Sequence, residues 1–211
     1  MTTTFASMAS RVLVNMPECP QPSAEAYLRL AAIDFCRRSF AWIETQAAVL
    51  LDATDMPYTI TPPANAKVVK VLSVVVDGIA PGLEESSVRS EELYTNDWRT
   101  AIGTPLRFIE AARGVVSVVP LPLVEASFVV TAAFVPTEAA AGIPDAIYDE
   151  YGSAIISGAI YMLAIIPQKP WTSGDLAALH KRMFESGIDD ASINYSTNYA
   201  AQSMNVAPPP I

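Results

Sequence analysis

The spacing of apolar residues changes along the chain and separates helical from extended segments. After Ser23, a suitable N-cap with Glu25 in the following turn, apolar side chains recur every three or four residues. This spacing places one apolar stripe along a helix, formed by Tyr27, Leu30, Ala31, Phe35, Trp42 and Ile43. The pattern predicts a helix from about Ala24 to Leu51. In the preceding lead-in, the residues from Ala6 to Val14 suit a small helix.

The segment after this helix carries short runs of β-branched and aromatic residues that end at turn residues, a pattern typical of strands. The runs cover Tyr58–Thr61, Lys67–Val76, Leu106–Ala111, Val115–Val119 and Ser127–Phe134. Asp77-Gly78 and Arg113-Gly114 predict turns, and residues 81–105 form a longer irregular excursion. Short strands at this spacing predict a small antiparallel β-sandwich or barrel.

Two helices are predicted in the C-terminal part of the chain. The first covers about Asp145 to Ile166 and has no charged residue after Glu150. Small residues interrupt its apolar run at Gly152, Ser153, Ser157 and Gly158. Such a helix is expected to be buried against other protein, with close backbone contact. The second helix begins near Ser173 and is expected to bend at Gly187.

The predicted fold class is α+β. A helical bundle layer of one N-terminal and two C-terminal helices is expected to be discontinuous in sequence, because a single N-terminal helix cannot bury its stripe alone. The polar and then proline-rich text from Asn194 predicts an extended C-terminal arm. The expected boundaries are a lead-in over 1–22, helical segments over 23–52 and 143–193, an inserted β module over 53–136, and an arm over 194–211.

Composition narrows the possible functions. With 51% hydrophobic and 17% charged residues, the 211-residue chain indicates a large core or apolar surface buried between subunits. The net charge of -9 disfavours general nucleic-acid binding, because few cations are present to displace phosphate counterions. The uncharged run from Tyr151 to Ile166 is short for a membrane span, and the N-terminus lacks a signal-peptide pattern. Cys36 is expected to be a buried free thiol, which fits a reducing compartment.

The residue inventory does not indicate catalysis. His180 is the only histidine, and with Cys19 and Cys36 it gives no zinc-ligand spacing. The glycines form no phosphate-binding loop. No cofactor, no metal and no enzymatic activity are therefore expected. A carboxylate-based hydrolase stays open as an alternative, which requires two or three acidic side chains to converge out of Asp77, Glu91, Glu92, Asp97 and Glu110.

Large aromatic residues are expected to anchor the fold. These structural anchors are Phe35, Trp42, Trp98, Trp171 and Phe184. Tryptophans near element boundaries more often fix loops on a core than form ligand platforms. A glycan-binding β module that uses Trp98 and nearby carboxylates is the alternative from another functional class.

Several short motifs follow one another in a fixed order over about residues 24–193. In the first half they are Ala31-Ala32-Ile33-Asp34-Phe35-Cys36-Arg37-Arg38, Trp42, the strand from Val68 to Asp77-Gly78, Leu93, Trp98, Gly103-Thr104-Pro105 and Phe108. In the second half they are Val116 to Pro122, Ile143-Pro144-Asp145, Tyr151, Gly158-Ala159, Leu163, Pro170-Trp171, Phe184, Gly187-Ile188 and Ala191. The ordered set resembles the head-to-tail adaptor (connector) proteins of tailed bacteriophages, with Ile143 where that family usually has leucine.

This resemblance implies a structural virion protein at the neck, assembled in the host cytoplasm. Such adaptors form a homo-oligomeric ring, typically of twelve copies, which docks on the portal protein and joins the capsid vertex to the tail. The implied partners are the chain itself, the portal, and tail or nozzle proteins. DNA passes only in transit through an axial channel during genome ejection, and no membrane is involved. Another neck or tail ring component, or a head-completion protein, is the alternative within this class.

The resemblance also suggests where the subunits meet. The region of Ser153, Ser157 and Gly158 is expected to let helices of neighbouring copies approach closely around the ring. The arm is expected to reach the portal or an adjacent subunit through Tyr195, Tyr199, Met204 and Ile211. Because the chain is acidic, negative side chains are hypothesised to line the channel so that DNA slides without sticking.

Overall fold

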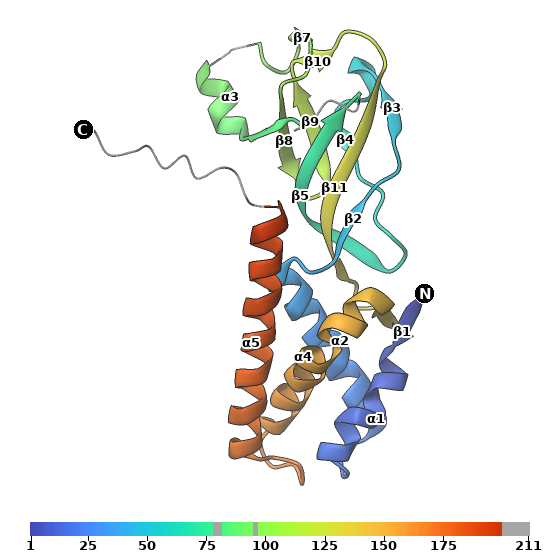
Figure 1. Ribbon diagram of the computed structural model, residues 1–211, viewed down its shortest axis with the longest axis vertical. Coiled ribbons are helices and arrows are strands. Elements are labelled where there is room, and N and C mark those ends of the chain that lie inside the picture. Colours follow the sequence, from blue (N-terminus) through green and yellow to red (C-terminus); the bar gives the residue numbers. More distant parts are fainter. Residues whose placement is uncertain (78–81, 95–96, 200–211) are drawn as a thin grey trace, which may run out of the picture. The chain divides into compact units, whose positions relative to one another are not determined.

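A computed structural model describes residues 1–77, 82–94 and 97–199, and its fold is α+β (Figure 1). The chain divides into two compact units. The helical unit combines Met1–Ala41 with the chain from Gly142 onward, and the β unit comprises Trp42–Ala141. The β unit is therefore an insertion between two parts of the helical unit.

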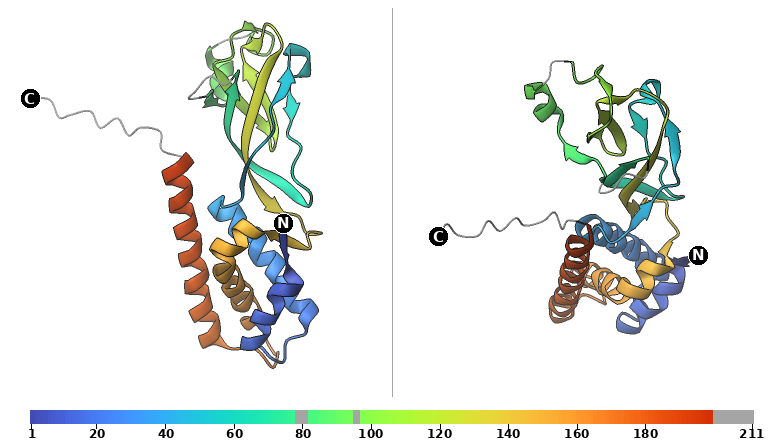
Figure 2. Two further views of the ribbon diagram at one scale, coloured as in Figure 1. Left: turned by 45° about the vertical axis from the view of Figure 1, so that its right-hand side comes forward. Right: turned by 45° about the horizontal axis from the view of Figure 1, so that its top comes forward.

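The described residues of the helical unit form four helices, which come from distant parts of the sequence and pack together. They are α1 (Phe5–Asn15), α2 (Gln21–Ser39), α4 (Asp145–Ala164) and α5 (Gly174–Tyr199). Helices α2 and α4 contact each other and lie in the middle, while α1 and α5 flank them on opposite sides (Figure 2). The small helix expected in the lead-in is α1. It packs in the bundle, which therefore has two N-terminal helices and not the single one that was expected.

Helix α1 is tied to the start of α4 by a short sheet. Strand β1 (Thr2–Thr4) pairs antiparallel with β12 (Gly142–Pro144), and the Thr3 hydroxyl donates to the Asp145 carboxylate at 2.7 Å. At Gly142 the backbones come so close that a Cβ atom would lie 2.2 Å from the carbonyl oxygen of Thr3. The lead-in is therefore an integral part of the helical unit.

Helix α2 ends earlier than its apolar spacing predicts. Phe40 adopts the left-handed conformation with φ of 53°, and its N–H donates to the carbonyl of Cys36, which caps the helix after Ser39. The expected helix to Leu51 is therefore wrong beyond Ser39. Trp42 directly precedes β2 (Ile43–Thr45), which is followed by β3 (Val49–Leu51), so the apolar residues after Ser39 belong to a sheet and not to a longer helix.

The predicted helix from Asp145 to Ile166 is confirmed as α4, which ends at Ala164. It is buried on most sides because α1, α2 and α5 all contact it. Helix α5 begins next to Ser173, whose hydroxyl accepts a hydrogen bond from the N–H of Leu176, and it continues through Gly187 to Tyr199. Residues 194–199 are therefore helical, and the expectation of an extended arm from Asn194 is wrong for them.

Where the structure describes the β unit, its strands form two four-stranded sheets and a two-stranded pair. Its further elements are η1 (Ala53–Asp55), β4 (Tyr58–Thr59), β5 (Ala66–Val76), β6 (Glu84–Ser86), α3 (Val88–Tyr94), β7 (Ile102–Gly103), β8 (Arg107–Ala112), β9 (Val115–Val119), β10 (Leu121–Pro122) and β11 (Ala126–Pro136). In one sheet β11 pairs with β5 along one edge and with β2 and β3 along the other. The second sheet has the order β4-β9-β8-β6.

The five predicted strands are confirmed to within about two residues, but the arrangement differs from a purely antiparallel module. Strands β6 and β8 are parallel, as are β7 and β10. The sheets in the described residues do not close into a barrel. The turn at Gly114, which joins β8 to β9 with φ of 73°, is as predicted, whereas Gly78 lies outside the described residues.

The excursion expected over residues 81–105 has more regular structure than its sequence indicates, since β6, α3 and β7 lie within it. Trp98 fixes it on the β unit, because the indole is 6% exposed and packs with Ile109, Val119 and Val88. Leu93, in contrast, is 77% exposed and fixes nothing in this chain.

Candidate functional site

Helices α4 and α5 meet through small residues. A Cβ atom on Gly187 would lie 2.4 Å from the Cβ of Ala154, and one on Gly158 would lie 2.6 Å from the ring of Phe184. Both distances are far below a normal carbon contact, so the two helices approach this closely only because these positions are glycine. The close approach that Gly158 permits is thus made within the chain, and its space is not open to a neighbouring subunit.

An open groove runs along the outer side of this helix pair. Its volume is about 500 Å³, and its walls come from α4 (Glu150, Tyr151, Ser153, Ala154 and Ser157) and α5 (Arg182, Met183, Ser186, Gly187 and Asp190). The structure therefore brings together Ser153 and Ser157, two of the residues expected at a subunit interface. Ser153 and Ser186 are exposed at the groove.

Ser157 is the unusual member of this groove. It is only 3% exposed, and within the described part of the chain its hydroxyl makes no hydrogen bond. Its oxygen is not among the fully buried polar atoms of the described residues, so the hydroxyl reaches the solvent in the groove. A molecule bound in the groove can therefore hydrogen-bond to it.

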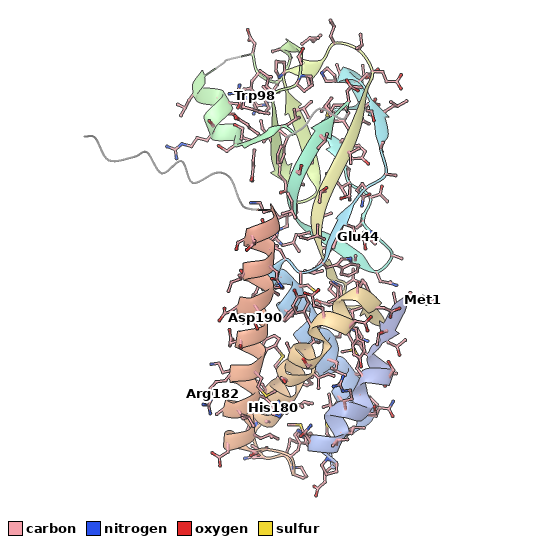
Figure 3. All side chains as sticks on the ribbon, in the orientation of Figure 1. Met1, Glu44, Trp98, His180, Arg182 and Asp190 are labelled. Atoms are coloured by element: carbon pink, nitrogen blue, oxygen red, sulfur yellow. The ribbon has the colours of Figure 1, made fainter. Side chains whose placement is uncertain are left out.

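Charged groups lie at the rim of the groove. Glu150 stands on α4, and Arg182 and Asp190 lie along α5 (Figure 3). Arg182 and Asp190 form no salt bridge among the described residues. Tyr151, whose hydroxyl accepts a hydrogen bond from the Asn194 amide at 3.1 Å, has a pKa raised by burial.

The groove is supported from below by an aromatic cluster. The ring of Phe35 on α2 lies 5.3 Å from that of Tyr151 and 6.2 Å from that of Phe184, measured between centroids. Phe35 and Phe184 are fully buried. On the adjoining surface Arg38 forms a bidentate pair with Glu185, and this hydrogen bonding lowers the pKa of the Glu185 carboxyl. Both phenylalanines are therefore anchors that connect α2 to α4 and α5.

The other residues expected at the interface have different positions. Tyr195 belongs to α5, and its ring lies 5.2 Å from that of Phe40 in the same chain. Tyr199 is the last residue of α5, and its side chain is not among those described. Met204 and Ile211 lie outside the described residues. The contacts of the arm with other molecules stay a prediction.

The three tryptophans pack against their own chain. Trp42 is 6% exposed, its ring lies 6.2 Å from that of Phe134, and its Nε1 donates to Glu44 at 2.8 Å. The guanidinium of Arg99 covers the ring of Trp98 at 4.4 Å. Trp171 is half-buried in the α4–α5 connection, beside a hollow of about 230 Å³. Trp98 is thus occupied by packing and by Arg99, an arrangement that gives no support to a sugar-stacking platform.

Four of the five acidic residues named for a hydrolase, all except Asp97, have separate partners in the structure. The side chain of Glu91 is fully buried, and its carboxylate lies 3.1 Å from the guanidinium of Arg107. The partners of four carboxylates are Arg107 and Ser86 for Glu91, Arg99 for Glu92, the N–H groups of Val71 and Gly114 for Glu110, and the N–H of Ser127 for Asp77. No group of three or more potential metal ligands occurs among the described residues.

His180 and the two cysteines are buried within the helical unit. Burial lowers the pKa of His180, whose Nδ1 has no hydrogen-bond partner in the described part of the chain. Burial raises the pKa of Cys36 to about 12, and it also raises the pKa of Cys19. Both thiols are free. Cys36 is therefore a buried thiol, as predicted from its position on an apolar helix.

A second hollow lies in the β unit. It encloses about 390 Å³ between the ends of strands, and its exposed apolar members are Leu106, Leu123 and Val124. Exposed apolar surface of this kind commonly marks a protein contact. This hollow and the α4–α5 groove are therefore the two larger uncovered hollows described here, one in each unit.

Sequence reasoning found the α4 wall of the groove but missed the α5 wall. The small residues of α4 interrupt a long apolar run and are conspicuous for that reason. Ser186 and Gly187 follow charged and aromatic residues, so Gly187 was expected to bend the helix. The signal that connects the two walls is that both helices carry adjacent small residues, Ser153-Ala154 and Ser186-Gly187.

Comparison with known proteins adds one match. The family model described as SU10 adaptor protein matches residues 3–208, which is nearly the whole chain. No curated protein matches the chain. Among the helices in the described residues, none is long and apolar enough to cross a membrane.

Proposed function

The chain belongs to the SU10 adaptor protein family, a family of phage head-to-tail adaptors, and from this membership we propose that it forms a ring that docks on the portal. Membership makes it a structural, virion-associated protein that works with other head or tail proteins. We propose a ring of twelve copies that joins the capsid vertex to the tail. Its axial channel lets the genome pass during ejection.

The groove between α4 and α5 is the observation that best supports assembly. It is open over about 500 Å³, and the hydroxyl of Ser157 in its lining has no hydrogen-bond partner in the described chain. A neighbouring molecule can supply that partner and cover the small residues around it. Ser153, which is exposed at the same groove, belongs to the proposed contact, whereas Gly158 is occupied by Phe184.

Two further features support the remaining parts of the proposal. Residues after Tyr199 carry no charged side chain and include Met204, Val206 and three consecutive prolines, a composition suited to lying along another protein surface. We propose that this segment contacts the portal. The net charge of -9 supports a channel lined by acidic side chains, past which DNA moves without binding.

The proposal is tested by measuring the mass of the purified protein, alone and mixed with the portal protein of the same phage, by native mass spectrometry. We expect a complex in which twelve copies are bound to the portal. If the protein stays free of the portal but joins a different neck or tail ring, the alternative neck-component function is correct. A monomer that binds no virion protein would contradict both.

A further inference from the structure

The helical unit has two dissimilar outer sides. Helix α1 lies on one side of the central pair α2 and α4, and α5 lies on the other, as Figures 1 and 2 both show. The groove is formed by α4 and α5, so it and the exposed face of α1 are two different surfaces of the helical unit. Copies that join through two different surfaces can continue from one subunit to the next and close into a ring.

The groove has a defined chemistry. Its walls are lined by the small side chains of Ser153, Ala154 and Ser186, which allow another helix to approach closely. Ser157 is 3% exposed and lines the groove, and its hydroxyl lacks a hydrogen-bond partner in the described chain. The carboxylates of Glu150 and Asp190 lie at the rim, together with Arg182. A fitting occupant is therefore a helix with a small, hydroxyl-bearing face and a positive charge.

Helix α1 presents such a face to the outside. Its inward residues are Phe5, Met8, Ala9 and Val12, and each is buried. Its outward residues, all exposed, are Ala6, Ser7, Ser10, Arg11 and Val14. Arg11 is the only charged residue of the helix, and among the described residues its side chain has one hydrogen bond, to the Tyr148 hydroxyl at 3.2 Å. Val14 adds an apolar side chain that is 81% exposed.

We propose that α1 of one copy lies in the α4–α5 groove of the next copy. This inference rests on the proposed ring and names the two surfaces that form it. Ser10 meets the small walls of the groove, and its hydroxyl, which donates to the Ser7 carbonyl at 3.1 Å, accepts a hydrogen bond from the Ser157 hydroxyl. Arg11 lies near Glu150 and Asp190. Each copy then contributes one α1 face and one groove, so every such surface in a closed ring is covered.

Two variants test the α1 face and the groove separately. In Ser10→Trp the α1 face is blocked and the groove is intact, whereas in Ser186→Trp the groove is filled and the α1 face is intact. Both serines are exposed, so the added indole does not enter the core. Ser196→Trp is the matched control, because Ser196 is an exposed serine of α5 outside the groove. Circular dichroism confirms that each variant is folded.

Assembly is measured by native mass spectrometry under the condition that assembles the wild type, alone or with the portal protein. We expect each blocking variant alone to form no ring and the control to assemble normally. An equal mixture of the two blocking variants should form dimers and nothing larger, since one intact α1 face meets one intact groove. A ring formed by either folded variant, or a mixture without dimers, overturns this inference while leaving the proposed ring intact. A wild type that assembles under neither condition overturns both.

Discussion

The packing of α4 on α5 depends on the absence of a Cβ atom at Gly158 and Gly187. At Gly187 and Ala154 the helices are so close that one additional methyl group has no space, because both Cβ positions are fixed to the backbone. Phe184 next to Gly158 is fully buried and cannot move aside at low cost. The width of the groove is thus set by glycine and alanine rather than by flexible side chains.

Gly187→Ala is expected to destabilise the protein by about 1–3 kcal/mol through overpacking, which exceeds the gain of up to about 1 kcal/mol from replacing a helical glycine. Adding Ala154→Gly removes the opposing methyl group and should restore part of the loss. Urea unfolding of the two single variants and the double variant measures the coupling between these positions.

Gly174→Ala serves as the control for this cycle. No atom lies within 4 Å of a Cβ placed on Gly174, so the substitution should leave the free energy of unfolding unchanged or slightly increase it. Strictly additive effects of Gly187→Ala and Ala154→Gly would contradict the account of the α4–α5 contact.

His180 is expected to make stability depend on pH. Burial lowers its folded-state pKa below the unfolded value of about 6.5, so the unfolded chain binds the proton more readily. The free energy of unfolding should therefore be at its full value above pH 6.5 and should fall as the pH drops toward the lowered pKa. Urea unfolding at pH 7.5 and 5.5 should show a smaller decrease for His180→Gln than for the wild type, and equal decreases would exclude His180 as the source.

At the scale of elements, the C-terminal end of the chain has two parts, for which we expect different functions. Residues 194–199 belong to α5, where Asn194 bonds to Tyr151 and Tyr195 packs on Phe40. The segment after Tyr199 lies outside the described residues. The two parts can therefore be removed separately.

Truncation after Tyr199 is expected to weaken portal binding strongly without changing the melting temperature. Truncation after Ile193 removes the contacts of Asn194 and Tyr195 as well, and it should also lower the melting temperature by several degrees. Calorimetry and a pull-down with the portal protein measure both effects. Unimpaired portal binding by the shorter chain would show that the segment after Tyr199 is not a portal contact.

Strands and helices that repeat one simple period were predictable from sequence. Strand β9 matches its predicted range, and α4 was predicted from an uncharged run bounded by Pro144 and Pro167. The end of α2 was not predictable for two reasons. Phe40 adopts the left-handed conformation that ends the helix although it is not a glycine. Trp42 also lies at a position that fits the apolar spacing of the helix, although it comes after the helix end.

The candidate groove was half predictable for a related reason. The sequence shows which residues of α4 are small, but it does not show which helix lies against them. Phe184 fills the space at Gly158, whereas the serines at 153 and 157 stay at the groove. Only the fold separates these adjacent positions into an internal contact and an outer surface.

At the scale of the whole molecule, family membership and the uncovered surfaces both indicate that the protein works by assembling with other molecules. The chain is a phage adaptor whose helical unit carries an outward α1 face and a groove, and whose β unit carries an apolar hollow. Catalysis has no comparable support, because the carboxylates with known contacts each serve a local structural purpose. The proposed function therefore requires that copies of the protein assemble with one another and with the portal.

Electron cryo-microscopy of the protein bound to the portal of its own phage tests this requirement most directly. The account predicts twelve copies around the portal axis, with α1 of each copy against the α4–α5 groove of the next and acidic side chains facing the channel. Reconstructions in which the protein is absent from the portal, or bound there as isolated copies that do not touch one another, would contradict it.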